Sequence, residues 1–189
     1  MASPAFHPLD CPDPAQVSFG TDGLRGHVGT AITSTLALQV GFWCGRVLPS
    51  DGPVLIGMDS RTSGSMLVSA LAAGLTAAGR EVWTLGLCPT PAVPSLIRRF
   101  EAAGGLMVSA SHNPPEDNGI QVLGPHGSQP GSAIQSHLQA GLRGPARPLP
   151  QSQAVRVSHP RSDLLDLYPQ DLPKSVPHQR LYGDPIALD

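Results

Sequence analysis

The stretch Leu106-Met107-Val108-Ser109-Ala110-Ser111-His112-Asn113-Pro114-Pro115 joins an apolar run to a polar loop. Residues 106–108 favour a β-strand, and so do Ile120-Gln121-Val122 after the turn pair Asn118-Gly119. We therefore predict two strands whose connection is longer than a two-residue hairpin. Two hydroxyls, an imidazole and a carboxamide then lie at the end of a strand, where functional residues are often found, although a serine loop beside prolines is usually a plain turn.

The chain around this loop alternates between strand patterns and helix patterns. Connections of this length must cross a face of a sheet, which favours parallel strands with right-handed crossovers. We therefore predict an α/β fold, as a three-layer α/β/α domain with a mixed, mostly parallel sheet. The predicted elements are a helix that Ser34 caps and Pro49 ends, a strand over 53–58, a helix that Ser63 caps and Gly79 ends, a strand over 81–85, a helix from Thr90 toward Phe100 that Gly104 and Gly105 end, and a helix over 132–142.

The composition limits the possible classes of protein. The chain has 189 residues, of which 40% are hydrophobic, 4% are aromatic and 12 are Lys or Arg, with a net charge of -2. This charge balance supplies no basic stripe, so no nucleic-acid partner is expected. The three cysteines include no Cys-x-x-Cys pair, so neither a disulfide framework nor a zinc site is indicated. No apolar run reaches the roughly 18 residues of a membrane span, and we expect a cytoplasmic protein.

The chain is predicted to divide into four segments. Residues 1–16 contain four prolines and no apolar period, which indicates a disordered leader. Residues 17–143 form the α/β domain. Residues 144–180 are predicted to be a linker with one short amphipathic turn at 164–168, and residues 181–189 resemble the first strand of a second domain that is cut off.

Ser111 is the candidate reactive group. It could be an acyl-transfer nucleophile, but the Gly-x-Ser-x-Gly elbow is missing and His112 is its direct neighbour, which disfavours a serine hydrolase. It could instead carry a phosphoryl group, a role that needs donors and cations nearby. Gly20-Thr21-Asp22-Gly23-Leu24-Arg25-Gly26 would let Arg25 fork onto a phosphate, although such a segment is often an ordinary turn.

The roles of three further groups stay open at this point. Arg61 is either a second phosphate contact or the partner of Asp59 or Asp22 in a salt bridge that fixes a loop. His112 is either a proton carrier or a donor that orients a phosphoserine. Residues 116–117 are interpreted as a solvated loop tip that supports the Asn118-Gly119 turn.

Four segments, 20–26, 59–63, 88–92 and 109–119, occur in the order in which they occur in the first domain of the phosphohexomutase superfamily, which this chain resembles over residues 17–142. The chain is most similar to the phosphoglucosamine mutases, which interconvert glucosamine 6-phosphate and glucosamine 1-phosphate through a bisphosphorylated sugar. The resemblance implies that Ser111 is phosphorylated, that its phosphate helps to ligate Mg²⁺, and that Arg25 and His112 flank the reacting groups. It further implies that a phosphorylated hexose or amino sugar is bound by Arg25, Arg61, Asn113 and Gln121.

Two departures from the family pattern qualify this expectation. Gln121 stands where the family commonly has a lysine, and no Asp-Gly-Asp-x-Asp-Arg metal loop occurs in the 189 residues, so Mg²⁺ ligands other than the phosphoserine are absent. We expect the amino-terminal catalytic-serine domain of a phosphoglucosamine mutase-like phosphotransferase of the isomerase class, truncated and inactive alone. The alternative is a non-catalytic remnant, or a phosphosugar-binding or interaction module of the same fold.

Overall fold

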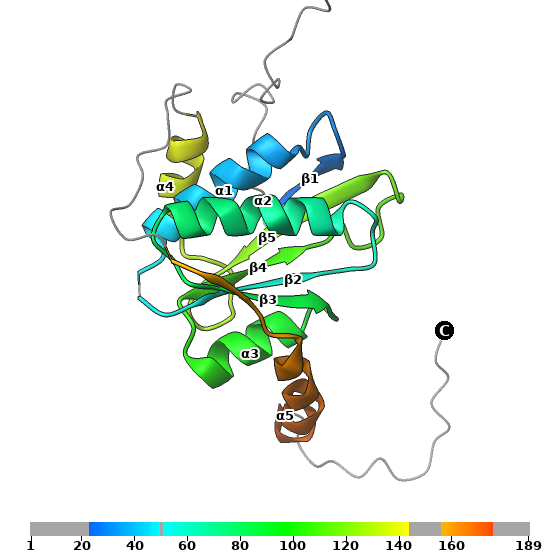
Figure 1. Cartoon of the computed structure of the whole chain (residues 1–189), viewed down its shortest axis with the longest axis vertical. Helices are drawn as coiled ribbons and strands as arrows, with labels where there is room; N and C mark the ends of the chain where they lie inside the picture. Colours follow the sequence, from blue (N-terminus) through cyan, green and yellow to red (C-terminus); the bar gives the residue numbers. More distant parts are fainter. Residues whose placement is uncertain (1–22, 50, 144–155, 176–189) are drawn as a thin grey trace, which may run out of the picture.

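The computed structural model describes residues 23–49, 51–143 and 156–175, which form a layered α/β domain around a six-stranded sheet (Figure 1). The strand order is β1-β5-β4-β2-β3-β6. The strands are β1 (Leu24–His27), β2 (Val54–Met58), β3 (Val82–Leu87), β4 (Gly104–Val108), β5 (Asp117–Leu123) and β6 (Ser158–Pro160). The helices are α1 (Ser34–Val47), α2 (Gly64–Ala77), α3 (Ala92–Phe100), α4 (Ser132–Arg143), the 3-10 helix η1 (Ser162–Leu167) and α5 (Tyr168–Ser175).

The sheet is mixed, and helices cover both of its faces. Strands β4, β2, β3 and β6 are parallel neighbours, whereas β5 runs antiparallel to both β1 and β4. Figure 1 shows α1, α2 and α4 on one face of the sheet and α3 and α5 on the other. There are two buried apolar clusters, one of which includes Val40 and Leu71 and the other Leu85 and Leu96. The predicted three-layer α/β/α fold with a mostly parallel sheet is confirmed.

The ends of the helices differ from the predicted ones in local detail. Thr33, not Ser34, caps α1, because its side-chain oxygen accepts a hydrogen bond from the Leu36 amide. Ser63 precedes α2 but makes no capping bond with its side chain. The helix α3 ends at Phe100, and the residue that caps it, Glu101, has a φ of 49° and lies three residues before the predicted stop. Gly79, in contrast, has the predicted left-handed conformation after α2, with a φ of 88°.

Two glycine-containing pairs lie in strands where turns or helix ends were predicted. Gly104 and Gly105 start β4, and a Cβ at Gly104 would lie 2.5 Å from the carbonyl oxygen of Leu123 on the neighbouring strand. Asn118 and Gly119 belong to β5, where Asn118 is fully buried. The predicted turn at this pair is therefore wrong, because the pair lies in a strand where the side-chain amide of Asn118 is bonded to the distant Ser63 and to the adjacent Gly119.

Helices α1 and α2 approach each other closely through two glycines. A Cβ at Gly74 would lie 2.1 Å from the carbonyl oxygen of Leu38, and one at Gly41 would lie 2.2 Å from that of Leu71. The small residues of α2 were expected to allow close packing on the sheet. Gly74 instead lets one helix backbone contact the other, which helps to fix how α2 lies over β2.

The chain returns to the domain at its described carboxyl end. The strand β6 extends the sheet beside β3, and the guanidinium of Arg161 lies 4.8 Å from the centre of the Trp83 ring. Arg99 of α3 forms an ion pair with Asp171 of α5. Residues 156–175 are thus packed on the domain, in contrast to the linker predicted over 144–180. The segments predicted as a leader (1–16) and as the start of a second domain (181–189) lie outside the described residues.

Candidate functional site

A pocket of about 680 Å³ opens where β2 and β4 end. It is lined by residues 59–62 after β2 and by Ser109, Ser111, His112, Asn113 and Pro115 after β4. Because β2 and β4 are parallel, their carboxyl ends meet at one edge of the sheet, as the sequence predicted for the loops that begin at Asp59 and Ser109. The loop after β3, which was expected to join them, contributes no residue to this pocket.

Ser111 is exposed at this pocket, in an unusual backbone conformation. Its φ is 56°, in the left-handed region that residues with a Cβ seldom adopt. Its amide donates a hydrogen bond of 3.0 Å to the hydroxyl oxygen of Ser109. Its own hydroxyl lies 3.4 Å from Nδ1 of His112, which is also exposed. This distance is long for a hydrogen bond, so the hydroxyl of Ser111 is held loosely and is accessible.

Arg61 is almost buried beneath the loop that carries Ser111, and all five N–H groups of its guanidinium donate hydrogen bonds to this loop or to Asp59. Nε donates to Oδ2 of Asp59, Nη2 donates to the carbonyl oxygens of Ser111 and Asn113, and Nη1 donates to those of Pro114 and Asp117. The side chain is 11% exposed. These bonds favour the loop-fixing interpretation of Arg61 over a phosphate contact, because every N–H of the guanidinium already has a protein acceptor.

The carboxylate of Asp59 links the two loops that form the pocket. Its Oδ2 accepts a hydrogen bond of 2.7 Å from the hydroxyl of Ser109, in addition to the bond from Arg61. Its Oδ1 accepts from the backbone amide of Arg61. The salt bridge between Arg61 and Asp59, one of the alternatives that the sequence left open, is therefore present. The role of Ser109 as a loop support was missed from the sequence, where the alternate spacing of the hydroxyls of Ser109 and Ser111 was the only signal.

The far end of the loop is also fixed by side chains. Nδ2 of Asn113 donates to Oδ2 of Asp117, so the expected phosphate ligand Asn113 is tied within its own loop. Asn118 donates through Nδ2 to the hydroxyl of Ser63, and its Oδ1 accepts from the amide of Gly119. Asp117 is half-buried and starts β5. It is therefore part of the loop's support, not of a solvated tip.

Arg25 and Gln121 lie on the sheet beside the pocket and do not line it. Arg25 is exposed on β1, opposite Gly119 of β5, and Gly119 in turn accepts a hydrogen bond from the amide of Ser109. Gln121 is half-buried on β5, opposite Met107. Since residues two apart on a strand share a face, Arg25 and Gln121 lie on the same face of the sheet. Residues 20–22 of the glycine-containing segment lie outside the described residues.

The described residues do not form a magnesium site by themselves. They contain no group of three His, Cys, Asp or Glu side chains that could hold a metal ion. The one carboxylate that lines the pocket, Asp59, already accepts three hydrogen bonds. Mg²⁺ needs about six oxygen ligands in octahedral geometry. The donor set around Ser111 therefore does not fit this ion without ligands from elsewhere.

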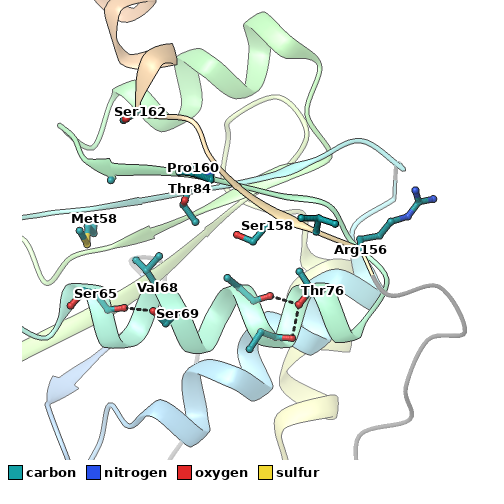
Figure 2. Close-up of a pocket in the computed structure, with 14 residues that line it drawn as sticks. Met58, Ser65, Val68, Ser69, Thr76, Thr84, Arg156, Ser158, Pro160 and Ser162 are labelled. Atoms are coloured by element: carbon teal, nitrogen blue, oxygen red, sulfur yellow. Dashed lines mark hydrogen bonds between the residues drawn. The ribbon is translucent and has the colours of Figure 1, made fainter.

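A second hollow, of about 790 Å³, lies between α2 and the strands β3 and β6 (Figure 2). Two of the hydroxyls that line it are bonded within α2, because that of Ser69 donates to the carbonyl oxygen of Ser65 and that of Thr76 donates to carbonyls of the same helix. Arg156 is the one charged residue that lines it. This hollow holds none of the predicted site residues and offers no nucleophile beside an acid or base, so the pocket at Ser111 is the candidate site.

Elsewhere in the part of the chain that the structure describes, two features bear on function. No helix there is both long enough and apolar enough to cross a membrane.

Burial raises the pKa of the Cys44 thiol to about 12 and also raises the pKa of the Cys88 thiol. Because the thiolate is the nucleophile, neither of these cysteines is suited to nucleophilic chemistry at neutral pH.

Most of the chain is similar to proteins of one known family. Residues 16–145 match the family model described as phosphoglucomutase/phosphomannomutase, alpha/beta/alpha domain I. The whole chain aligns with a phosphoglucosamine mutase from Synechococcus sp. (strain WH7803) at 82% identity, and the alignment covers 41% of that protein. It also aligns over its whole length with a phosphoglucosamine mutase from Prochlorococcus marinus (strain MIT 9313), at 61% identity and over 41% of that protein. The chain thus spans about two fifths of the length of these relatives.

A solved structure of a phosphoglucomutase/phosphomannomutase family protein from Burkholderia thailandensis has the same fold. It superposes with a TM-score of 0.61 at 26% identity, over 77% of this chain and 33% of that protein. The family model covers more than half of the chain and includes the loop that carries Ser111. The chain therefore belongs to the phosphoglucomutase/phosphomannomutase family, through its α/β/α domain I.

Proposed function

We propose that this chain supplies the phosphoryl-carrying serine of a phosphoglucosamine mutase-like enzyme. The observation that carries the proposal is the exposed hydroxyl of Ser111, on a loop that Arg61 and Ser109 hold at the carboxyl ends of the parallel strands β2 and β4. Two relatives that match the whole chain are phosphoglucosamine mutases. The substrate class is a phosphorylated hexose or amino sugar, with glucosamine 6-phosphate and glucosamine 1-phosphate as the specific pair.

The proposed chemistry is a phosphoryl relay. The Oγ–P bond of phosphorylated Ser111 breaks as a hydroxyl oxygen of the sugar monophosphate bonds to phosphorus, and the proton of that hydroxyl passes through a base to the released Oγ. The bisphosphorylated sugar then returns its other phosphoryl group to Oγ of Ser111, whose proton passes to the sugar oxygen that has lost that group. Nδ1 of His112 lies 3.4 Å from the hydroxyl of Ser111, and we assign His112 to proton transfer or to orientation of the phosphoserine. When bound by ligands from outside this chain, Mg²⁺ would offset phosphate charge.

A second candidate is a phosphosugar-binding or interaction module without catalysis. It is favoured by the positions of two predicted anion contacts. The N–H groups of Arg61 already donate to Asp59 and to the loop, so they are not available to a phosphate. Arg25 lies beside the pocket without lining it. An isolated domain of this kind would bind a phosphosugar weakly and would transfer no phosphate.

A chimera separates the two candidates. Residues 1–189 replace the matching 41% of the Synechococcus relative, and the conversion of glucosamine 6-phosphate to glucosamine 1-phosphate is measured with Mg²⁺ and a hexose bisphosphate primer. We expect turnover, together with a gain of one phosphate by intact mass that Ser111→Ala abolishes. A folded chimera that lacks both would reject the mutase proposal. The 189-residue chain alone, given the same primer, should gain little or no phosphate.

A further inference from the structure

The backbone at Ser111 is held in a conformation that the chain would not adopt unaided. Among the described non-glycine residues, Ser111 and Glu101 are the two with a positive φ. Glu101 ends α3, which is a common use of the left-handed conformation. Ser111 ends no helix, so the groups around it must maintain its conformation.

Hydrogen bonds fix Ser111 on both sides of its Cα. Its amide donates to the Ser109 hydroxyl oxygen at 3.0 Å, and its carbonyl oxygen accepts from Nη2 of Arg61 at 2.9 Å. The hydroxyl of Ser109 donates its single proton to Asp59 at 2.7 Å. Because that proton is committed, the oxygen of Ser109 is oriented as an acceptor for the amide of Ser111. The two bonds therefore hold the φ and ψ of Ser111 from opposite sides.

Arg61 extends this control to the rest of the loop. Its guanidinium has five N–H donors in one plane, and the protein accepts from all of them: one at Asp59 and four at carbonyl oxygens of residues 111, 113, 114 and 117. A lysine could supply three donors and no planar fork. The arrangement therefore depends on arginine in particular, and its 11% exposure protects it from competing water.

We propose that Ser109 and Arg61, joined through Asp59, are positioning residues that keep Ser111 in its left-handed conformation and so set where its hydroxyl meets a phosphoryl group. The effect on phosphoryl transfer rests on the proposed function, whereas the effect on backbone conformation does not. The two residues act through Ser111 and need not touch the sugar. Transfer requires the attacking and leaving oxygens to lie roughly in line with phosphorus, and a displacement of about 1 Å costs about 100-fold in rate.

The conformational part is tested on the 189-residue chain itself. Hydrogen exchange of the Ser111 amide is followed by NMR in the unmodified chain, in Ser109→Ala and in Ser109→Thr. We expect exchange about tenfold faster or more in Ser109→Ala and restored protection in Ser109→Thr, which keeps a hydroxyl. The amide of Ala37 in α1 reports whether the fold is intact. Unchanged exchange at Ser111 in a folded Ser109→Ala chain would overturn the proposal.

The functional part is tested in the chimera described above. We expect Ser109→Ala to lower kcat about 10- to 100-fold, with KM for the sugar phosphate changed less than about threefold, and Ser109→Thr to recover most of kcat. Arg61→Lys should lower kcat in the same way as Ser109→Ala, with a similarly small change in KM. If the Arg61→Lys chimera does not fold, the two Ser109 variants test the proposal without it.

The two proposals fail in different ways. An inactive unmodified chimera counts against the proposed function and leaves the exchange result standing. An active chimera whose kcat is unaffected by Ser109→Ala overturns the positioning role. A fall in kcat that Ser109→Thr does not recover also contradicts it, because the hydroxyl would then not be the group that matters.

Discussion

The guanidinium of Arg61 is joined to the carbonyl oxygen of Ser111 by a hydrogen bond of 2.9 Å, although the two residues lie 50 positions apart in the sequence. The same side chain contacts three other carbonyl oxygens of the loop and the carboxylate of Asp59. One residue after β2 thus organises the loop after β4. The parallel arrangement of these strands makes the contact possible, since it brings both loops to one edge of the sheet.

Arg61→Ala should destabilise the domain. The change leaves one carboxylate and four carbonyl oxygens without their donor, and we expect a loss of about 2–4 kcal/mol in the free energy of unfolding, measured by urea denaturation. Arg98→Ala, on the exposed side of α3, is the matched control and should change stability by less than about 0.5 kcal/mol. Equal effects from the two substitutions would contradict the account of Arg61.

Ser111→Gly should not destabilise the folded chain. A left-handed residue with a Cβ costs about 1–2 kcal/mol, which glycine relieves, whereas the greater freedom of glycine in the unfolded chain costs about 0.5–1 kcal/mol. We expect a net gain of up to about 1 kcal/mol by urea denaturation, with the loss of any phosphoryl transfer. Ser65→Gly in the helix α2 is the control and should lose about 0.5 kcal/mol. A clear loss at position 111 would show that its backbone is not strained.

Gly74→Ala should weaken the packing of α1 against α2. Alanine favours a helix by about 1 kcal/mol over glycine, but here its Cβ would lie 2.1 Å from the carbonyl oxygen of Leu38. The carbonyl oxygen is part of the backbone and the Cβ is bonded directly to it, so neither atom can move aside without a shift of its helix. The two helices must therefore separate, and we expect a net loss of about 1–3 kcal/mol in the free energy of unfolding. Gly131→Ala, where a Cβ would meet nothing within 4 Å, should be close to neutral by the same measurement.

Alkaline conditions should reduce the stability that the buried Cys44 contributes. Burial raises the pKa of its thiol from 9.0 to about 12, so the folded chain keeps the proton while the unfolded chain releases it near pH 9. The difference in unfolding free energy between the chain and Cys44→Ala should be constant from pH 6 to 8 and shrink as pH rises from about 9 toward 12. A difference that stays constant to about pH 11 would mean that the thiol is not protected by burial.

Gln121→Lys should raise turnover in the chimera if the reaction uses a cation at this position. Gln121 lies half-buried on β5, on the face of the sheet that also carries Arg25, and its amide cannot titrate. We expect a higher kcat with little change in stability, and a new dependence of kcat on alkaline pH where the lysine loses its proton. Unchanged kcat would count against a catalytic cation at position 121.

The sequence by itself determined the elements whose patterns are local. Apolar residues at spacings of three and four, such as Leu36 and Val40, specify α1, and the continuous apolar run 54–58 specifies the buried strand β2. The order of these elements then specifies a parallel sheet and the edge at which Asp59 and Ser109 meet, because crossovers of this length leave few alternatives. The same order places Ser111 at that edge, whereas its role as the reactive group was implied mainly by the family resemblance.

Only the tertiary structure decided how the remaining polar groups are used. The sequence pattern predicts a turn at Asn118. In the structure its side-chain amide donates a hydrogen bond to Ser63, which is 55 positions away, and Asn118 is buried within a strand. Arg61 reads equally well as a phosphate ligand or a loop support until the carbonyl oxygens around it are known. Hydrogen bonds between distant residues leave no period in a sequence, since they depend on which backbone atoms the fold brings within about 3 Å of a side chain.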